Sequence, residues 1–152
     1  MHSISIQEDD FNLDKEIRQA EASAANAGAI VSFTGRVRGH DHEKPLSHLF
    51  LEYFPEVTEA EIEKIILQAK AQWPILYVRV IHRVGRLDVG ENIVLVLTAS
   101  EHRKAAYQAN EFIMDYLKTR APFWKKEHFA DGNSHWVEMK QSDVEHTESW
   151  QN

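Results

Sequence analysis

The feature that most constrains the fold is an apolar strand that runs directly into an amphipathic helix. Residues 93–97 read Ile-Val-Leu-Val-Leu, a run that is typical of a buried strand. Apolar residues then recur at three- and four-residue spacing, which predicts a helix with one buried face. Pro122 ends this helix, because proline lacks the backbone N–H that a helix interior requires. The expected buried stripe consists of Ala105, Ala109, Phe112, Ile113, Tyr116 and Leu117.

The end of this helix and the residues after it carry a cluster of positive charge. Between residues 118 and 126 there are four cations and no acid: Lys118, Arg120, Lys125 and Lys126. In a chain with a net charge of -7, such a cluster indicates an anion site. The alternative is a solvated helix face whose basic end favours the helix dipole. Arg103, Met114 and Lys118 fall within roughly 60° of one another, away from the apolar stripe.

Composition narrows the class of protein. A chain of 152 residues forms one domain, or one domain with a small subdomain. Its negative charge argues against general binding to nucleic acids or anionic membranes. With no cysteine, disulfides, thiolate metal sites and a cysteine nucleophile are excluded. No apolar run reaches membrane-spanning length and no signal peptide is recognisable, so the expected location is the cytoplasm.

The rest of the chain alternates between helix and strand patterns. Expected helices are residues 13–25, stopped by Gly28, and residues 59–73, with a capping box made by Thr58 and Glu61. Ser100 is expected to cap the helix that follows it. Residues 85–90 are predicted to form a turn at two glycines, and residues 131–133 a hairpin. Expected strands are residues 3–7, 29–37, 46–54, 76–84, 92–99, 123–129 and 134–139.

Because several strands are connected by hairpins, the expected class is an α+β fold with a mixed sheet. One domain is expected over residues 1–140. The polar, acidic residues 141–152 are predicted to be a loose tail, except around Trp150.

Several residues are candidates for ligand binding before any resemblance is considered. Gly35 interrupts its strand, which predicts a bulge or a close approach by another group. Arg36 and Arg38 alternate with Val37, so both are predicted to point away from it. Arginine binds phosphate through paired hydrogen bonds, although a solvent-facing pair at a strand end is the alternative. His102, beside Arg103, could bond a ligand oxygen at a helix start that favours anions, or could be a surface residue.

The lysines are the best candidates for proton transfer. Lys118 and Lys125 lie on either side of a turn broken by proline, so their amines could face one cavity. Trp124 alternates with Lys125 and is predicted to pack in the core. His82 follows an apolar strand and is interpreted as structural. A His-x-His loop at His40 and His42 could bind zinc, but a mobile surface loop is the preferred interpretation.

Five motifs follow one another between residues 30 and 138. They are Phe33-Thr-Gly-Arg-Val-Arg38, Leu51-Glu-Tyr-Phe-Pro55, His82-Arg-Val-Gly-Arg-Leu-Asp-Val-Gly-Glu91, Ser100-Glu-His-Arg103 and Phe112-Ile-Met-Asp-Tyr-Leu-Lys-Thr-Arg-Ala-Pro-Phe-Trp-Lys-Lys-Glu127, and Trp136-Val-Glu also fits. Each motif alone is weakly specific, but five in order are highly specific. Together they resemble the large, catalytic subunit of molybdopterin synthase. Glu56 departs from the pattern, because glycine is common after the proline there.

The resemblance implies an α/β hammerhead-type domain with an added small antiparallel β subdomain. It implies a sulfurtransferase that converts cyclic pyranopterin monophosphate (precursor Z) into molybdopterin without a cofactor or metal. The sulfur comes from a small ubiquitin-like subunit that ends in a Gly-Gly thiocarboxylate. The large subunit forms a homodimer within a heterotetramer.

The resemblance also implies roles for individual residues. By the family pattern, Lys118 and Lys125 are the catalytic amines. Some site residues are expected to come from the neighbouring chain. The residues expected at the pterin phosphate are Arg38, His102 and Arg103, and those expected to line the same site are Arg36, Val37, Lys126 and Glu127. Two alternatives remain: a phosphometabolite-binding module without catalysis, and a metal hydrolase that uses His40 and His42.

Overall fold

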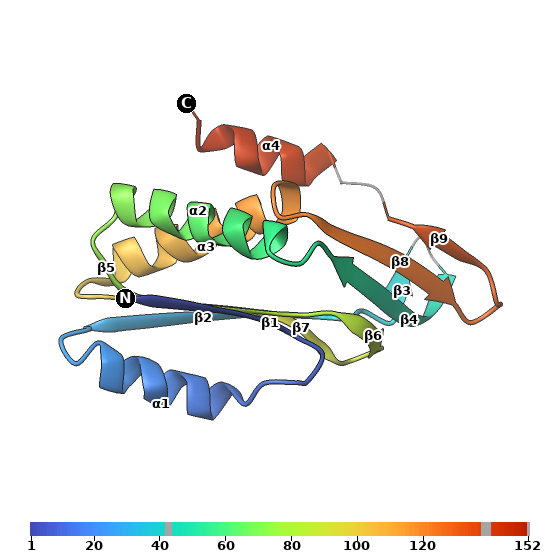
Figure 1. Cartoon of the computed structure of the whole chain (residues 1–152), viewed down its shortest axis with the longest axis horizontal. Helices are drawn as coiled ribbons and strands as arrows, with labels where there is room; N and C mark the ends of the chain where they lie inside the picture. Colours follow the sequence, from blue (N-terminus) through green and yellow to red (C-terminus); the bar gives the residue numbers. More distant parts are fainter. Residues whose placement is uncertain (42–43, 138–140, 152) are drawn as a thin grey trace.

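The computed structural model describes residues 1–41, 44–137 and 141–151, and within them the strands form two sheets. The order in the first sheet is β1 (His2–Gln7), β5 (Ile75–Arg83), β7 (Asn92–Ser100) and β2 (Ala29–Arg36). The β1–β5 pair is parallel, whereas β5–β7 and β2–β7 are antiparallel. The sheet is therefore mixed, and the predicted α+β class is confirmed (Figure 1).

The second sheet is antiparallel and lies beside one end of the first (Figure 1). Its central strand β4 (Lys44–Tyr53) pairs with β3 (His40–Asp41), β6 (Gly85–Asp88) and β8 (Phe123–Phe129), and β9 (Ser134–Trp136) pairs with β8. Sequence patterns missed β3 and β6, because strands this short show no clear alternation. The predicted turn glycines Gly85 and Gly90 do adopt positive φ, at 83° and 88°.

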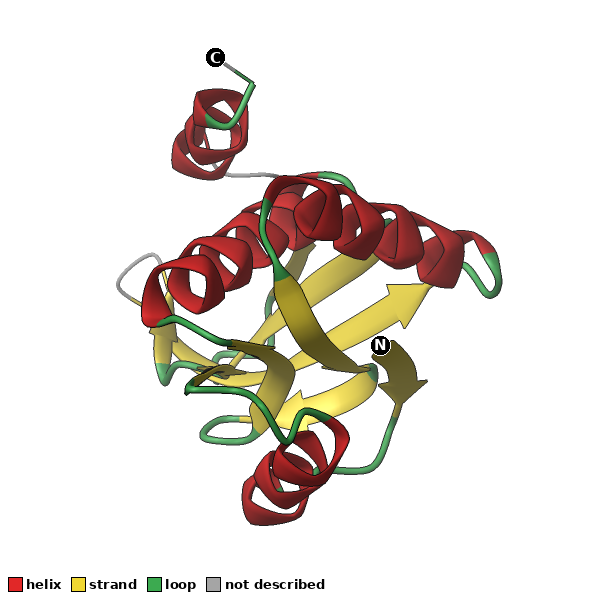
Figure 2. Ribbon diagram, turned by 90° about the vertical axis from the view of Figure 1, so that its left-hand side faces the viewer, coloured by secondary structure: helices red, strands yellow, loops and turns green. Residues whose placement is uncertain are grey.

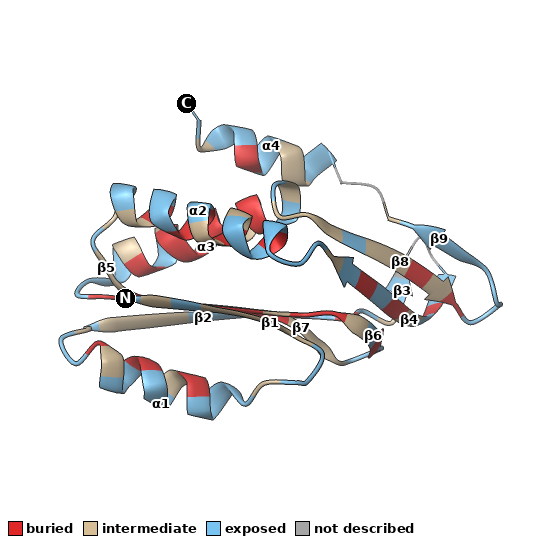
Figure 3. Cartoon of the chain, viewed as in Figure 1, coloured by how far each residue is buried: buried red, intermediate tan, exposed pale blue. Residues whose placement is uncertain are grey.

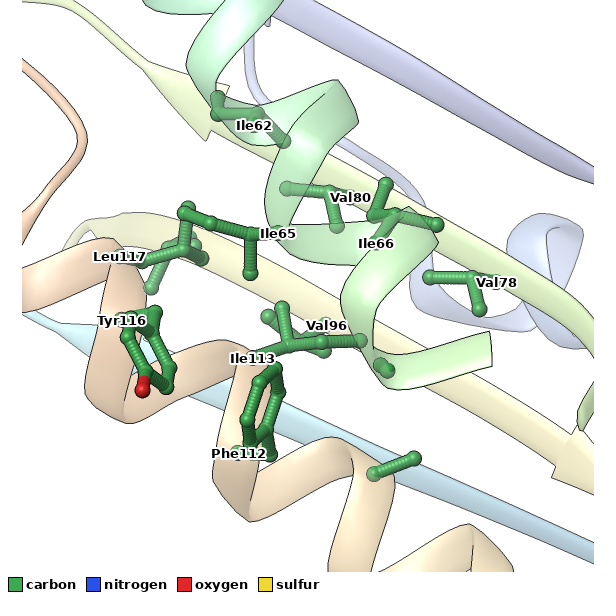
Figure 4. Packing of buried hydrophobic residues seen from close by; sticks show 13 residues of the cluster. Ile62, Ile65, Ile66, Val78, Val80, Val96, Phe112, Ile113, Tyr116 and Leu117 are labelled. Atoms are coloured by element: carbon green, nitrogen blue, oxygen red, sulfur yellow. The ribbon is translucent and has the colours of Figure 1, made fainter. Parts of the chain in front are cut away.

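Helices cover both faces of the first sheet (Figure 2). Helix α1 (Leu13–Ser23) lies on one face, and α2 (Val57–Gln72) and α3 (Arg103–Thr119) lie on the other. Strand β7 is consequently buried on both sides, which explains its continuous apolar run. The core under α2 and α3 includes Ile62, Ile65, Ile66, Val78, Val80, Val96, Phe112 and Ile113 (Figure 4).

The buried stripe of α3 is rotated slightly from the predicted one. It passes through Ala106 and Asn110, whereas Ala105 is only partly buried. The Asn110 amide donates to the carbonyl oxygens of Val31 and Val96, at 3.2 and 2.9 Å, so a polar residue is satisfied inside the core. Because Asn110 is polar, the spacing of apolar residues did not show which side of α3 is buried.

The start of α3 also differs from the prediction. The predicted Ser100 cap is wrong, because the Ser100 hydroxyl donates to the carbonyl of His102 instead of accepting a helix N–H. His102 is the N-cap residue, and its side chain forms no capping hydrogen bond.

The start of α2 contains a buried threonine hydroxyl, Thr58, that bonds to two neighbouring turns. The predicted capping box is wrong, since the N-cap is Glu56 and its partner is Glu59. Thr58 is instead fully buried, where its hydroxyl accepts the Phe54 N–H and donates to the Pro122 carbonyl, both at 3.0 Å. Thr58 thereby ties the start of α2 to the turn that leads into β8.

Glu56 occupies the position where the family pattern favours glycine. Its backbone has φ 72° and ψ -44°. Positive φ is unfavourable for a residue with a Cβ atom, whereas glycine adopts it freely. A glycine, which the resemblance leads us to expect here, would adopt this φ freely, whereas glutamate adopts it at a cost in strain.

The C-terminal segment is a helix, not the loose tail that its polar composition predicted. Helix α4 (Gln141–Ser149) packs on α3, and a buried band faces that helix (Figure 3). The Thr147 hydroxyl is buried, 2.8 Å from the Thr119 hydroxyl. The Trp150 ring meets Trp73 and Phe112 edge-on, with centroids 5.5 Å apart in both pairs. Trp150 thus packs against the main core cluster, in agreement with its exception from the predicted tail.

Some predictions concern residues that the structure does not describe. Residues 138–140 lie outside the described residues, so the predicted strand 134–139 is confirmed only as far as Trp136. His42 and Glu43 of the candidate zinc loop lie outside them as well. Among the described residues, no group of three or more His, Asp or Glu side chains is placed to hold a metal ion. In the same part of the chain, every helix is too short or too polar to cross a membrane.

Candidate functional site

One cavity lies at the first turn of α3, and a second runs along the helix from Tyr107 to Lys118. The first has a volume of about 480 Å³ and is lined by Gly28, Glu101, His102, Arg103 and Lys104. The second has a volume of about 450 Å³ and lies between α3, β2 and α4. The side chains that line the second cavity include Phe33, Tyr107, Glu111, Met114, Asp115, Lys118, Asp143 and His146.

The first cavity depends on a close backbone approach at Gly28. A Cβ atom at this position would lie 2.3 Å from the carbonyl oxygen of Glu101, and the Gly28 N–H donates to the Ser100 carbonyl at 3.0 Å. The role predicted for Gly28 as a helix stop is wrong, because α1 already ends at Ser23. Gly28 instead allows the β2 side of the sheet to contact the start of α3.

The charged side chains that line the first cavity are Arg103, Lys104 and Glu101, so positive charge is in excess there. His102 and Arg103 are both exposed there, and the first turn of α3 contains no acidic residue. The positive end of the helix dipole therefore adds to the guanidinium charge. His102 and Arg103 thus line the same cavity, and their binding of one ligand stays a prediction.

The second cavity contains Lys118. Its side chain is half exposed, and its Nζ lies 4.0 Å from Oδ2 of Asp143 on α4. Sequence reasoning missed Asp143 and His146, because residues 141–152 were expected to be a tail. The three-residue spacing of Val144, Thr147 and Trp150 was the available signal of a packed helix.

Strand alternation places the two neighbouring lysines of β8 on opposite faces. Lys125 shares a face with Phe123 and Glu127. Lys126 lies on the other face, where its Nζ is 5.4 Å from the ring centre of Trp136, within the range of a cation–π contact. The prediction that Trp124 packs in the core is wrong, because it is 46% exposed on this outer face.

Glu127 is a buried acid within the same strand. Only 2% of its surface is exposed, and Oε1 lies 3.1 Å from Nε2 of His135 on the paired strand β9. A carboxylate is costly to bury unless a charged or hydrogen-bonding partner compensates it. Glu127 and His135 therefore connect β8 to β9.

His82 experiences the positive charge of Lys125. Its ring stacks on Phe123, with centroids 3.7 Å apart and a 15° interplanar angle. The Nδ1–H group donates to the Arg83 carbonyl at 2.9 Å. Burial, together with the smaller effect of the positive charge of Lys125, lowers the pKa of His82 to about 4 despite this hydrogen bond. His82 is therefore neutral near pH 7, in agreement with its interpretation as structural.

The end of β2 holds the remaining candidates. The predicted irregularity at Gly35 is confirmed, because the register with β7 shifts there and a Cβ atom would lie 2.8 Å from Val94. Arg36 is exposed and donates to the Gly90 carbonyl at 2.5 Å. Arg38 is exposed as well, whereas Val37 is 3% exposed and packs in the core of the second sheet. The alternation predicted for this segment therefore holds, and Val37 faces the protein interior.

One chain does not bring the whole predicted set into one cavity. Arg103 begins α3 and Lys118 lies in its last turn, so a rise of 1.5 Å per residue separates them by roughly 22 Å. Their shared angular position around the helix, predicted from the sequence, therefore does not make them neighbours. His102 and Arg103 belong to one cavity and Lys118 to the other.

Comparison with known proteins adds to this geometry. A sequence profile described as MoaE protein matches residues 6–120. The molybdopterin synthase catalytic subunit of Mesorhizobium japonicum is 48% identical over 149 residues, which cover 97% of this chain and 92% of that protein. The molybdopterin biosynthesis MoaE protein of Burkholderia ambifaria matches in structure with a TM-score of 0.85 and 41% identity, over 100% of this chain and 99% of that one.

A more distant structure preserves the same fold. Molybdopterin synthase from Staphylococcus aureus gives a TM-score of 0.79 at 30% identity, over 88% of this chain and 96% of that one. The family profile covers most of the chain, and the structural matches extend over the elements that carry both cavities. This chain therefore belongs to the MoaE family.

Proposed function

We propose that this protein is the catalytic subunit of a molybdopterin synthase. It transfers sulfur from the C-terminal thiocarboxylate of a small ubiquitin-like subunit to cyclic pyranopterin monophosphate, and two transfers form the dithiolene of molybdopterin. Family membership and the name of the M. japonicum relative support this activity. The proposed assembly is a homodimer of this chain with one small subunit bound to each copy.

The observation that carries the proposal is the pair of lysines around the Pro122 turn. Lys118 lines the cavity that runs along α3, and Lys125 lies on β8 just after the turn and outside the lining of that cavity. An amine can donate or accept the proton when a thiocarboxylate is attacked and its sulfur is released. Because the chain has no cysteine, it has no thiol of its own to carry the sulfur, which must arrive on a partner.

We further propose that the site is completed by the neighbouring chain of the homodimer. The cations at the start of α3 lie too far from Lys118 to share a small substrate with it in one chain. In a two-fold dimer, the start of α3 in one chain can face the end of α3 in its partner. Arg38, His102 and Arg103 then bind the phosphate, and Arg36, Val37, Lys126 and Glu127 surround the same substrate.

The test is a product assay with cyclic pyranopterin monophosphate and the thiocarboxylated small subunit. Lys118→Ala and Lys125→Ala are each expected to lower dithiolene formation by at least about a hundredfold, the usual minimum for loss of an acid–base group. Lys64→Ala is the matched control, since Lys64 is an exposed lysine on α2. Circular dichroism checks that each variant is folded. Full activity in folded Lys118→Ala protein would overturn the proposal.

A further inference from the structure

Helix α4 brings a carboxylate to the proposed catalytic amine. Asp143 Oδ2 lies 4.0 Å from Lys118 Nζ, and both side chains line the same cavity. The Asp143 side chain is 19% exposed, compared with 50% for Lys118, so the acid is the more enclosed partner. We propose that Asp143 is a positioning residue that holds the Lys118 amine at its cavity, which makes α4 part of the catalytic unit. This inference rests on the function proposed for Lys118.

The position of α4 is fixed by contacts away from Lys118. The Trp150 Nε1–H donates to Oδ2 of Asp115 at 2.7 Å, and the Thr147 hydroxyl lies 3.1 Å from the Asp115 carbonyl oxygen. The Trp150 ring also meets Phe112 and Trp73 edge-on. These contacts attach α4 to α3 at Asp115, which lies about one helical turn before Lys118. Asp143 therefore lies on a helix whose position is fixed by packing against α3.

The acids around the cavity have different partners. The Asp115 carboxylate accepts the Trp150 indole N–H, whereas Asp143 is within ion-pair distance of Lys118. Lysine has a long flexible side chain, so an unrestrained ammonium samples many positions. A nearby carboxylate restricts those positions, and an amine held in place reacts more often in the correct geometry.

A purely structural role for Asp143 makes a different prediction. Asp143 lies in the first turn of α4, where a negative charge stabilises the helix through its dipole. If this is its whole role, removing the charge would loosen α4 without a specific effect on Lys118. The two roles are distinguished by measuring Lys118 itself as well as the stability of the protein.

The experiment compares Asp143→Asn and Asp143→Glu, with Glu145→Gln as the control. Glu145 is exposed on the same helix and does not line the cavity, so its variant removes one charge without touching the site. The first readout is the rate at which an acylating reagent labels the Lys118 amine, measured by peptide mass spectrometry with the exposed Lys15 and Lys64 as internal references. The second is the kcat and KM of the complete synthase with its small subunit.

Asp143→Asn is expected to speed labelling of Lys118 about threefold to fivefold relative to the reference lysines, the range for a partly exposed ion pair. The same variant lowers kcat by a similar factor and leaves KM for the pterin substrate unchanged. Asp143→Glu restores most of both values, and Glu145→Gln changes neither. High salt is expected to speed labelling in the unaltered protein but not in Asp143→Asn, since salt screens the pair.

Two results would overturn the inference. Unchanged Lys118 labelling in a folded Asp143→Asn protein would show that the pair does not hold the amine. Unchanged kcat in that variant, while Lys118→Ala is inactive, would show that Asp143 does not position the amine for the reaction. Failure of the proposed function gives a separate result, in which Lys118→Ala itself remains fully active.

Discussion

At the scale of single residues, the structure shows how a histidine can be kept neutral beside a lysine. His82 stacks on Phe123 and donates its Nδ1–H to a backbone carbonyl, while burial lowers its pKa to about 4. In the unfolded chain the imidazole has its ordinary pKa of about 6.5. Between these two values the unfolded state binds a proton that the folded state does not. The free energy of unfolding must therefore decrease as the pH falls through this window.

This gives a pH prediction for stability. Lowering the pH from about 7 to about 5 is expected to remove about 2 kcal/mol of the free energy of unfolding through His82 alone. His82→Phe keeps an aromatic ring against Phe123 but cannot bind the proton, so its pH dependence is weaker by that amount. Urea denaturation at the two pH values measures the difference. Equal pH dependence in the two proteins would mean that His82 is not the group responsible.

A second residue-scale prediction concerns Gly28. A Cβ atom there would lie 2.3 Å from the Glu101 carbonyl oxygen, and backbone atoms cannot move aside as a flexible side chain can. Gly28→Ala is therefore expected to lower the free energy of unfolding by about 1–3 kcal/mol, the usual cost of overpacking. Gly39→Ala is the matched control, since the nearest atom to its Cβ lies 3.6 Å away. Urea denaturation that finds equal costs would contradict the role of this close approach.

At the scale of helices and strands, the buried Thr58 hydroxyl determines how β8 follows α3. It bonds both to the Phe54 N–H and to the Pro122 carbonyl in partly buried hydrogen bonds, so its loss leaves both groups without that partner. Thr58→Val is expected to cost about 2–4 kcal/mol in the free energy of unfolding, whereas Thr58→Ser keeps the hydroxyl and costs much less. Chemical denaturation of both variants tests this. Similar stability of the valine and serine variants would exclude the proposed link.

The same scale shows what could be predicted from the sequence. Strong periodicity predicted α3, and two-sided burial made β7 recognisable as an apolar run. The phase of α3 was misjudged because Asn110 is polar yet satisfied by backbone carbonyls in the core. Helix α4 was missed because a single aromatic residue, Trp150, supplies most of its apolar anchoring. Tertiary contacts of this kind leave only a weak trace in local composition.

The candidate site shows a similar division. Binding of a phosphorylated ligand by the lysines and arginine around the proline-broken turn stays a prediction. The separation of His102 and Arg103 from Lys118 could not be predicted, because helical periodicity gives the angle of a side chain around the axis but not its neighbours along it. The distance between Arg103 and Lys118 can be derived from the helical rise only once α3 is known to continue unbroken between them.

At the scale of the whole molecule, the proposed composite site predicts complementation between inactive chains. Arg103→Ala and Lys118→Ala homodimers are each expected to have very low activity. After unfolding and refolding as an equal mixture, half of the dimers are mixed, and each mixed dimer has one site without either substitution. About one quarter of the unaltered activity should therefore return. Activity no higher than that of the separate variants would place both residues in a site within one chain.

In the proposed reaction, Lys118 transfers a proton and does not act only by its charge. Lys118→Arg separates these two roles, because arginine keeps the positive charge but does not release its proton at working pH. With thiocarboxylated small subunit and pterin substrate supplied, this variant is expected to bind substrate but to form almost no dithiolene in a single turnover. Dithiolene formation at the unaltered rate would show that the positive charge is sufficient and that Lys118 transfers no proton in the reaction.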